Sequence, residues 1–290
     1  MIKQILIMEK QYIPFVEELI ELSIKEDIGD GDHTSLSTIP NDKRGKMKLL
    51  IKENGILAGI EVARMVFSRL DSTVSFEQYL NDGDKVKVGD IAFRVEGNLV
   101  TLLQSERIIL NLMQRMSGVA TQTAVYVKEL EGLKTRVLDT RKTTPGMRVL
   151  EKMAVKFGGG DNHRMGLYDM ILIKDNHIDF AGGVTEALTK CREYLKEKGK
   201  NLKIEIEVRS IEDVKEVFEA GGADRIMLDN FSTDLTREAV KLIDGRSEIE
   251  SSGGITIKTM RGYAECGVDV ISVGALTHHI RSLDMSLKAD

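Results

Sequence analysis

Two patterns of apolar positions follow one another along the chain. Up to about residue 131, amphipathic helices mix with alternating strands: Phe15, Leu19 and Leu22 form one stripe of a helix over 12–26. The pattern also predicts a strand over 47–51, a short helix near 63–70, strands near 74–80, 84–88 and 91–95, and helices over 101–116 and 119–131, broken near Ser117-Gly118. This part of the chain is therefore expected to form a small α+β unit.

From residue 133 onward, short apolar strands alternate with helical patterns. The strands are expected at 136–138, 170–173, 204–206, 225–228, 248–250 and 270–273. Strand–helix alternation with about twenty residues per unit indicates a parallel sheet that is closed or nearly closed into a barrel. Because only six strands are visible, the pattern does not predict a complete eight-stranded barrel.

Polar residues stand where nearly every one of these strands ends. They are Asp139-Thr140-Arg141-Lys142, Lys174, Glu207, Asp229-Asn230, Ser251-Ser252-Gly253-Gly254 and Gly274-Ala275. The C-terminal ends of parallel strands converge on one mouth, where active sites of α/β barrels are built. A purely structural protein has no reason to place charges at all of these ends, so the pattern favours an enzyme.

Composition and charge narrow the class of protein. The chain has 290 residues, of which 42% are apolar, and a net charge of −5, which argues against a general nucleic-acid binder. Residues 141–174 hold seven Lys/Arg and three Asp/Glu, a local charge of +4 that leaves −9 for the remainder. Since this basic stretch is rich in glycine and contains His163, an anion site is favoured over a solvated helical face.

The two cysteines and the N-terminal segment indicate no secretion. Cys191 and Cys266 lack the spacing of a disulfide framework or a zinc site and are expected to pack as small apolar residues. The apolar stretch 5–8 is too short for a signal peptide, and no segment approaches a membrane span. A soluble cytoplasmic protein is the expectation.

Two glycine-rich strand ends predict a phosphate site. Ser252-Gly253-Gly254 and Gly274-Ala275 end the last two strands, and glycines there let backbone N–H groups approach a phosphate. A single Gly-Gly pair would more often be a plain turn. Two such loops on consecutive strands match the usual place of phosphate in barrels.

The charged strand ends predict a ligand with several negative charges. Arg141, Lys142, Arg164 and Lys174, together with His163, supply cationic donors for carboxylate or phosphate, although any one of them alone could be a surface residue. Glu207 and Asp229 could each be a capping or salt-bridge residue. As a pair among cations they suit Mg²⁺, ribose hydroxyls or an oxocarbenium-like transition state.

Other charged residues are expected to be structural. Arg148, Glu151, Lys152 and Lys156 recur at helical spacing and are interpreted as a solvated face with an ion pair. His33, His278 and His279 lack the spacing of metal ligands and are expected at the surface or packed.

The motifs, taken in order, resemble one family over nearly the whole chain. They are Glu26-Asp27-Ile28-Gly29-Asp30-Gly31-Asp32, Glu106-Arg107, Ser117-Gly118-Val119-Ala120-Thr121, Asp139-Thr140-Arg141-Lys142-Thr143-Thr144-Pro145-Gly146, Glu151-Lys152, Gly158-Gly159-Gly160, Asn162-His163-Arg164, Ile173-Lys174-Asp175-Asn176-His177, Ile206-Glu207-Val208, Leu228-Asp229-Asn230-Phe231, Glu250-Ser251-Ser252-Gly253-Gly254 and Ser272-Val273-Gly274-Ala275-Leu276-Thr277-His278. This series is similar to that of the quinolinate phosphoribosyltransferase (nicotinate-nucleotide pyrophosphorylase, carboxylating) family.

The resemblance implies an α/β fold with two domains and a homodimer. The expected domains are an N-terminal α/β sandwich over 1–116, on which the tail 276–290 packs, and an incomplete parallel α/β barrel over 117–275. In the family pattern an arginine of the partner subunit, here Arg107, completes each pocket. The active sites would then be shared between two subunits.

The resemblance also implies the residue roles. Substrate carboxylates would meet Arg107, Arg141, His163, Arg164 and Lys174, with Thr140 beside them. Phosphoribosyl pyrophosphate would meet Lys142, Glu207, Asp229, Ser252, Gly253, Gly254, Val273, Gly274 and Ala275. Lys142, Glu207 and Asp229 would be catalytic, and Glu207 and Asp229 would hold Mg²⁺, directly or through water or the co-substrate.

The implied reaction converts quinolinate and phosphoribosyl pyrophosphate to nicotinate mononucleotide, pyrophosphate and CO2. One rival is a paralogous phosphoribosyltransferase associated with molybdate transport, which shares these motifs. A second rival is a biotinyl or lipoyl carrier module, because the run 81–91 resembles the hairpin of such domains. No modifiable lysine in the required setting follows that run, which disfavours a carrier.

Overall fold

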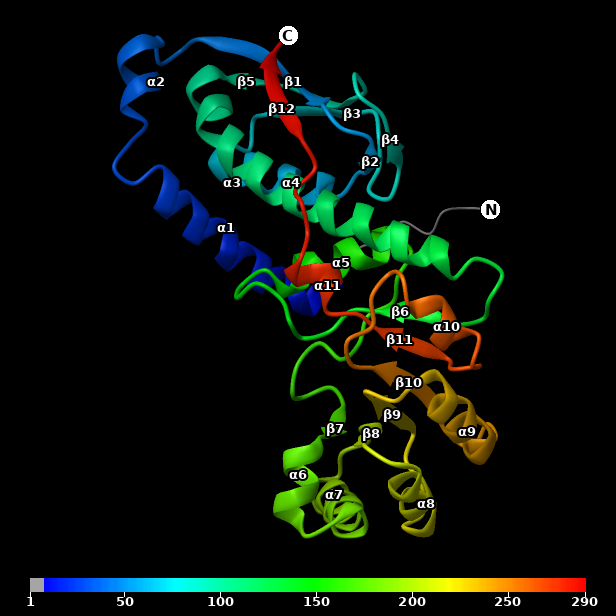
Figure 1. Ribbon diagram of the computed structural model, residues 1–290. Helices are drawn as coiled ribbons and strands as arrows, with labels where there is room; N and C mark the ends of the chain where they lie inside the picture. Colours follow the sequence, from blue (N-terminus) through cyan, green and yellow to red (C-terminus); the bar gives the residue numbers. More distant parts are fainter. Residues whose placement is uncertain (1–7) are drawn as a thin grey trace. The chain divides into compact units, whose positions relative to one another are not determined.

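Six parallel strands form the larger sheet of the structure, a computed structural model that describes residues 8–290 (Figure 1). The strands are β6 (Arg136–Leu138), β7 (Ile171–Ile173), β8 (Ile204–Val208), β9 (Arg225–Asp229), β10 (Glu248–Ser252) and β11 (Val270–Ser272). All six strands predicted from the sequence are confirmed. Their order is β6-β11-β10-β9-β8-β7, and no pairing among residues 8–290 joins β6 to β7, so the barrel is incomplete, as predicted.

This sheet belongs to one of two compact units, unit 2, which comprises Tyr126–Arg141 and Gly160–Gly274. Its helices are α6 (Asp175–Ala181), α7 (Val184–Lys198), α8 (Ile211–Glu219), α9 (Thr233–Ile243) and α10 (Met260–Ala264). Serine side chains begin two of them: Ser210 accepts the N–H of Asp213 at α8, and Ser232 accepts the N–H of Leu235 at α9. Helices that follow one another in the sequence lie side by side, from α6 through to α10.

Unit 1 comprises the described residues up to Val125, Lys142–Gly159 and Ala275–Asp290. Its four-stranded antiparallel sheet has the order β12-β1-β5-β3. A separate two-stranded sheet is formed by β2 and β4. The strands are β1 (Arg44–Ile51), β2 (Gly55–Ile56), β3 (Ser75–Gln78), β4 (Lys85–Val86), β5 (Ile91–Asn98) and β12 (Met285–Ala289). β1 pairs along its length with the last strand of the chain, from Met47 opposite Ala289 to Ile51 opposite Met285.

Two helices, α3 (Ile60–Leu70) and α4 (Leu99–Glu129), lie against this smaller sheet (Figure 1). The other helical segments of unit 1 are η1 (Lys10–Tyr12), α1 (Ile13–Asp27), α2 (His33–Thr38), α5 (Arg148–Phe157) and α11 (Ala275–His278). Three aromatic rings join α3 to the sheet: the Phe67 ring lies 6.0 Å from that of Phe76 and 6.3 Å from that of Phe93. Edge-to-face rings at this spacing stabilise a core beyond the area that they bury.

The expected break near Ser117-Gly118 is wrong, because α4 runs without interruption for 31 residues. Ser117 Oγ accepts the N–H of Ala58 at 2.9 Å, so this serine joins two segments instead of ending a helix. A Cβ on Gly118 would lie 2.3 Å from the carbonyl oxygen of Arg281. The glycine is therefore required for close packing, and its helix-breaking tendency is overridden.

The solvated face expected on α5 is also wrong. Glu151 and Lys152 are 0% and 1% exposed. Glu151 Oε1 accepts hydrogen bonds from Arg115 Nε at 3.0 Å and Nη2 at 2.8 Å, and its Oε2 accepts the N–H of Thr144 at 3.1 Å. The charge is buried because a fixed cation from α4 and a backbone donor satisfy it.

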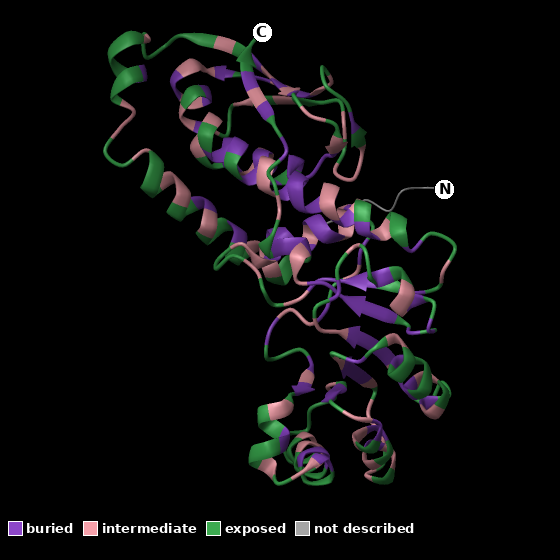
Figure 2. Cartoon of the chain, in the orientation of Figure 1, coloured by how far each residue is buried: buried purple, intermediate pink, exposed green. Residues whose placement is uncertain are grey.

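Purple buried residues in Figure 2 concentrate in the strands and in the middle of α4. Among residues 8–290, no helix has the length and the apolar character needed to cross a membrane. The expectation about the apolar stretch at the N-terminus rests mainly on Ile5, Leu6 and Ile7, which lie outside the described residues.

A carboxylate from a distant turn caps α3. Asp82 Oδ1 accepts the N–H groups of Gly59 at 2.7 Å and Ile60 at 2.9 Å. Burial raises the pKa of Asp82 to about 6, against the hydrogen bonds from Ile60 and Gly59, which lower it. The turn residue thus satisfies two of the free N–H groups at the start of the helix.

Removing this cap should destabilise the protein. We expect Asp82→Ala to lower the free energy of unfolding by about 1–2 kcal/mol, and Asp82→Asn to lower it much less, since the amide oxygen still accepts the N–H groups. The folded-state pKa of Asp82 lies above its ordinary value, so its contribution is complete at low pH and declines as the pH rises through about 6. The Asn variant should therefore gain stability relative to wild type between pH 5 and pH 8, measured by urea unfolding.

Asp90→Asn is the matched control. Asp90 accepts the N–H of Lys87 at 2.8 Å in a turn of the same unit but caps no helix. Parallel stability curves for wild type and Asp82→Asn across this pH range would contradict the expectation.

Candidate active site

One face of the six-stranded sheet carries polar and charged side chains in layers. Side chains alternate between the two faces of a strand, so Glu205 and Glu207 of β8 share a face. The register places Glu205 opposite Arg225 and Ser252 opposite Asp229. These four positions and Glu250 therefore point to the same side as Glu207, which lies nearest the C-terminal end of its strand.

The strand ends of β7, β8 and β9 bring three predicted residues together. Lys174 Nζ donates to Glu207 Oε2 at 3.0 Å; the lysine side chain is 47% exposed and that of the glutamate 9%. On the next strand, Asp229 Oδ2 accepts the side-chain amide of Asn230 at 2.6 Å. A cation and two carboxylates thus line the ends of adjacent strands.

The loop after β10 is closely packed. Gly253 has a φ of +91°, and a Cβ on it would lie 2.3 Å from Asn230 Oδ1. Ser272 Oγ donates to Ser252 Oγ at 3.2 Å, which links the ends of β10 and β11. Only glycine fits at position 253, so the backbone there approaches its surroundings without a side chain between them.

The end of β11 supplies the second predicted loop. The N–H of Val273 donates to the carbonyl of Leu138 at 2.9 Å, which extends the pairing with β6. Gly274 follows as the last residue of unit 2, and Ala275 begins α11 in unit 1, where its carbonyl accepts Gln122 Nε2 at 2.7 Å.

Two arginines of unit 2 lie close enough to repel each other. Burial lowers the pKa of Arg164, and the positive charge of Arg141 lowers it further. Arg164 Nη1 donates to the carbonyl of Met170 at 3.1 Å, which fixes one edge of the guanidinium. Like charges held together near strand ends are typical of a site that binds an anion.

His163 lies next to Arg164 but turns into the sheet. Its Nε2 is 3.0 Å from Glu205 Oε2 and 3.4 Å from Glu250 Oε2, and its side chain is 6% exposed. Its Nδ1 accepts the N–H of Arg164 at 2.8 Å. Asp139, which is 0% exposed, accepts the N–H of His163 at 2.9 Å. Nε2 thus lies within ion-pair distance of two carboxylates, and Nδ1 accepts a backbone hydrogen bond.

Opposing effects set the ionisation of this cluster. Burial lowers the pKa of His163, but the two carboxylates outweigh it and raise the pKa to about 9. Burial raises the pKa of Glu205, whereas at Glu250 the hydrogen bond and charge of His163 outweigh burial and lower the pKa. The N–H of Arg164 donates to Nδ1, which opposes protonation of that nitrogen.

Sequence reasoning missed Glu205, Arg225 and Glu250. Arg225 Nη1 lies 3.1 Å from Glu250 Oε2, and its Nε and Nη2 lie 2.9 and 2.8 Å from Glu248 Oε2. The available signal was the alternation of Glu and Ile in Ile204-Glu205-Ile206-Glu207 and Glu248-Ile249-Glu250. Such alternation usually marks a strand with one solvated face; here both faces of β8 are buried.

The remaining predicted residues occupy less central places. Thr140 is half-buried at the end of β6, where Arg141 follows it. Lys142 is an exposed residue of unit 1 whose carbonyl accepts Thr277 Oγ1 at 2.8 Å. Arg107 is exposed on α4, and within residues 8–290 it forms no ion pair with Glu106 or Glu129.

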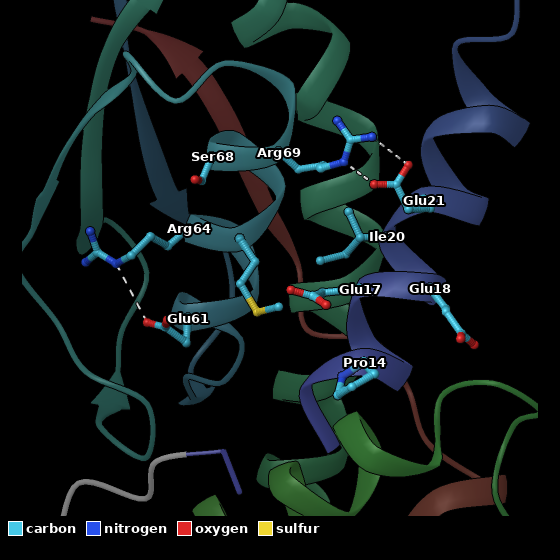
Figure 3. Close-up of a pocket in the computed structure, with 10 residues that line it drawn as sticks. Pro14, Glu17, Glu18, Ile20, Glu21, Glu61, Arg64, Ser68 and Arg69 are labelled. Atoms are coloured by element: carbon cyan, nitrogen blue, oxygen red, sulfur yellow. Dashed lines mark hydrogen bonds and ion pairs between the residues drawn. The ribbon is translucent and has the colours of Figure 1, made fainter. Parts of the chain in front are cut away.

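A separate pocket of about 790 Å³ lies between α1 and α3 of unit 1 (Figure 3). Carboxylates dominate its lining: Glu17, Glu18, Glu21 and Glu61. Its two arginines are already paired, Arg69 with Glu21 and Arg64 with Glu61. The pocket contains none of the predicted site residues, and its charge does not suit an anionic substrate.

Two family models together match most of the chain. The model of the quinolinate phosphoribosyl transferase N-terminal domain matches residues 32–117, and that of the C-terminal domain matches residues 119–288.

Curated relatives and solved structures agree with these matches. The chain is 44% identical to quinolinate phosphoribosyltransferase [decarboxylating] 2, mitochondrial, of Nicotiana glauca, over 95% of this chain and 82% of that protein. It is 42% identical to a probable nicotinate-nucleotide pyrophosphorylase [carboxylating] of Bacillus subtilis, over 94% of this chain and 92% of the relative. The structure is similar to NadC from Streptococcus pyogenes, with a TM-score of 0.89, 39% identity, and coverage of 94% and 95% of the two chains. A nicotinate-nucleotide pyrophosphorylase from Francisella tularensis gives a TM-score of 0.89 and 39% identity over 96% of each chain.

Proposed function

Because the chain belongs to the quinolinate phosphoribosyltransferase family, we propose that the strand ends of its six-stranded sheet form the active site for the family's reaction. The protein converts quinolinate and phosphoribosyl pyrophosphate to nicotinate mononucleotide, pyrophosphate and CO2, a step of NAD biosynthesis. The observation that carries the site assignment is the order of strand ends across the sheet: cations at the two edge strands β6 and β7, carboxylates at β8 and β9, and a glycine loop at β10.

Quinolinate has two carboxylates, and the cations of the site suit them. Arg141 and Arg164, held close together despite their like charge, bind one side of the substrate, with Thr140 and Lys174 beside them. His163 does so indirectly, because its buried ring accepts the backbone N–H of Arg164. Arg107 of a second copy of the chain supplies the other side, which makes the functional unit a homodimer with shared active sites.

Phosphoribosyl pyrophosphate occupies the remaining strand ends. Ser252, Gly253 and Gly254 present backbone N–H groups to its 5′-phosphate, helped by Val273, Gly274 and Ala275 in the next loop. Glu207 and Asp229 face the ribose, and Lys142 meets the pyrophosphate. The charge pattern supports this division, since carboxylates do not suit a phosphate and do suit ribose hydroxyls.

The carboxylates of Glu207 and Asp229 also fit Mg²⁺. Oxygen donors from neighbouring strands are the ligands that this ion prefers, and they can hold it directly, through water or through the co-substrate. Bound Mg²⁺ would neutralise part of the charge of the pyrophosphate. Lys174, now paired with Glu207, is exposed enough to move toward quinolinate when a cation takes its place.

The residues then act on charge as it develops. The bond from the ribose anomeric carbon to pyrophosphate breaks while the pyridine nitrogen supplies the electron pair of the new bond. Glu207 and Asp229 stabilise the positive charge at that carbon, and Lys142 stabilises the leaving pyrophosphate. The pyridinium formed accepts the electrons of the C–C bond as CO2 leaves, and a proton from solvent takes the place of the carboxylate.

Location in the cell stays an expectation. The location predicted from the sequence is the cytoplasm. Several plant relatives are named as mitochondrial or chloroplastic.

The pocket should demand both carboxylates of its substrate. Nicotinate would leave a guanidinium buried without its partner, which costs about 2–5 kcal/mol, so its kcat/KM should be roughly 30-fold or more below that of quinolinate. The measurement is pyridine nucleotide formed from each acid with phosphoribosyl pyrophosphate and Mg²⁺, together with CO2 released from quinolinate. Comparable kcat/KM values would contradict the assigned carboxylate site, and wild-type protein without turnover of quinolinate would favour the molybdate-associated paralogue.

A further inference from the structure

We propose that Glu205 and Glu250 are positioning residues. They orient Arg164 for binding quinolinate by holding His163, and they do not contact the substrate themselves. This inference rests on the proposed function. It assigns a role to buried side chains deep in the sheet that the reaction itself does not use.

A series of contacts links the interior of the sheet to the proposed site through His163. The Nε2 of His163 faces two buried carboxylates, Glu205 at 3.0 Å and Glu250 at 3.4 Å, and both residues are 0% exposed. The opposite ring nitrogen accepts the N–H of Arg164 at 2.8 Å. The two carboxylates and the backbone N–H lie against opposite sides of the ring and fix its orientation.

The carboxylates therefore hold the ring in the orientation on which Arg164 depends. Without them, the ring could turn, and Nδ1 would no longer face the Arg164 N–H. The backbone of Arg164 would lose this partner, and its guanidinium would keep only the hydrogen bond to the carbonyl of Met170, at 3.1 Å. A carboxylate-binding arginine displaced in this way binds its ligand more weakly.

A metal ion is the rival occupant of this cluster. His163, Glu205 and Glu250 each offer one ligand atom, all within 4.8 Å of one another. Arg225, however, already brings a fixed cation to 3.1 Å from Glu250 and 3.7 Å from Glu205. A divalent ion would meet that charge at close range, so the geometry favours the imidazole and Arg225 over a metal ion as partners of these carboxylates.

The test is a matched series at Glu205. Glu205→Met keeps the length of the side chain but removes the acceptor, and it should weaken quinolinate binding on the order of tenfold, leaving phosphoribosyl pyrophosphate binding within about twofold of wild type. Glu205→Gln retains an oxygen for Nε2–H and should recover most of the quinolinate affinity. Titration calorimetry with each ligand gives both dissociation constants, and Glu250→Met answers the same question if Glu205→Met does not fold.

Glu248→Met is the control. Glu248 binds the same Arg225 at 2.8 Å and lies on the same strand as Glu250, but it does not contact His163. It should leave quinolinate affinity unchanged.

The coupling through Arg164 gives the sharpest readout. In an Arg164→Ala background, Glu205→Met should weaken quinolinate binding no further, since the proposed route passes through Arg164. Additive losses would overturn the proposal, as would equal weakening of both ligands, unchanged quinolinate affinity in both Met variants, or a stoichiometric metal lost on Glu205→Met. Wild-type protein that binds no quinolinate would contradict the proposed function itself, a result that none of the variant comparisons can produce.

Discussion

Glu207→Gln and Asp229→Asn should each lower kcat by about 10²- to 10³-fold while quinolinate binding changes little. The positive charge at the ribose anomeric carbon exists only in the transition state. An interaction made only there acts on turnover and not on the affinity for the ground state. Both substitutions keep the shape of the side chain and remove its charge.

The structure also predicts the sign of the change in quinolinate affinity that Glu207→Gln should cause. Lys174 Nζ is 3.0 Å from Glu207 Oε2, so loss of the carboxylate charge releases the lysine. Quinolinate binding to Glu207→Gln should then be equal to that of wild type or slightly tighter, whereas Asp229→Asn has no such effect.

The measurements are steady-state kcat with saturating substrates and the quinolinate dissociation constant from calorimetry. Glu219→Gln is the control. Glu219 is exposed at the last position of α8, the helix that connects β8 to β9, and it is not one of the predicted site residues. If turnover survived in both variants while quinolinate affinity fell, the roles assigned to the two carboxylates would be wrong.

The six strands of unit 2 were predictable because most are short apolar segments and each is followed by, or ends in, polar or glycine residues. The sheet order brings these ends to one edge, so the candidate cations, carboxylates and glycine loop could be chosen from the sequence. In these strands the local sequence pattern agrees with the tertiary structure, and this agreement allows the fold to be predicted from the sequence.

Prediction from the local sequence pattern failed where the environment of a residue is set by a partner distant in the sequence. Ser117 and Gly118 have helix-breaking character, but Ala58 and Arg281 require them inside α4. Glu151 and Lys152 stand at the spacing of a solvated face, yet Arg115 and the packing of α5 bury that face. No window of sequence around either site contains the partner that decides its role.

The buried charges of the sheet show the same limit in the site itself. Glu205 and Glu250 alternate with isoleucine, a pattern that fits a strand with its charges in water. In a curved parallel sheet the second face is the interior, and it can hold carboxylates only because His163 and Arg225 reach them. His163 arrives from the loop after Asp161, which pairs with Leu138, so its contact with β8 and β10 depends on the whole sheet.

A second large effect is expected from sharing of the active site between two subunits. Arg107 lies on α4 in unit 1, exposed and, among residues 8–290, without an ion pair to a neighbouring glutamate. Arg164 lies in unit 2 beside Arg141. If Arg107 completes the pocket of the partner subunit, removing either arginine empties one side of the carboxylate site. Arg107→Ala and Arg164→Ala should each be nearly inactive, since a charge-assisted bidentate pair is lost.

Mixing the two inactive variants should then restore activity. In a mixed dimer one site collects both lesions and the other receives an intact Arg107 and an intact Arg164. Random exchange makes half of the dimers mixed, each with one good site, so activity should rise to roughly a quarter of wild type by the symmetry of a twofold interface. The measurement is quinolinate turnover after the two variants are unfolded and refolded together, with different affinity tags to verify exchange.

Each variant refolded with a differently tagged copy of itself is the control, and it should stay inactive because every site keeps the same lesion. Recovery that rises with the fraction of mixed dimers would establish that one pocket draws on two chains. A mixture no more active than its parents, despite verified exchange, would place Arg107 in the site of its own subunit or in no site at all. The experiment separates these arrangements because only a shared pocket can assemble an intact site from two damaged chains.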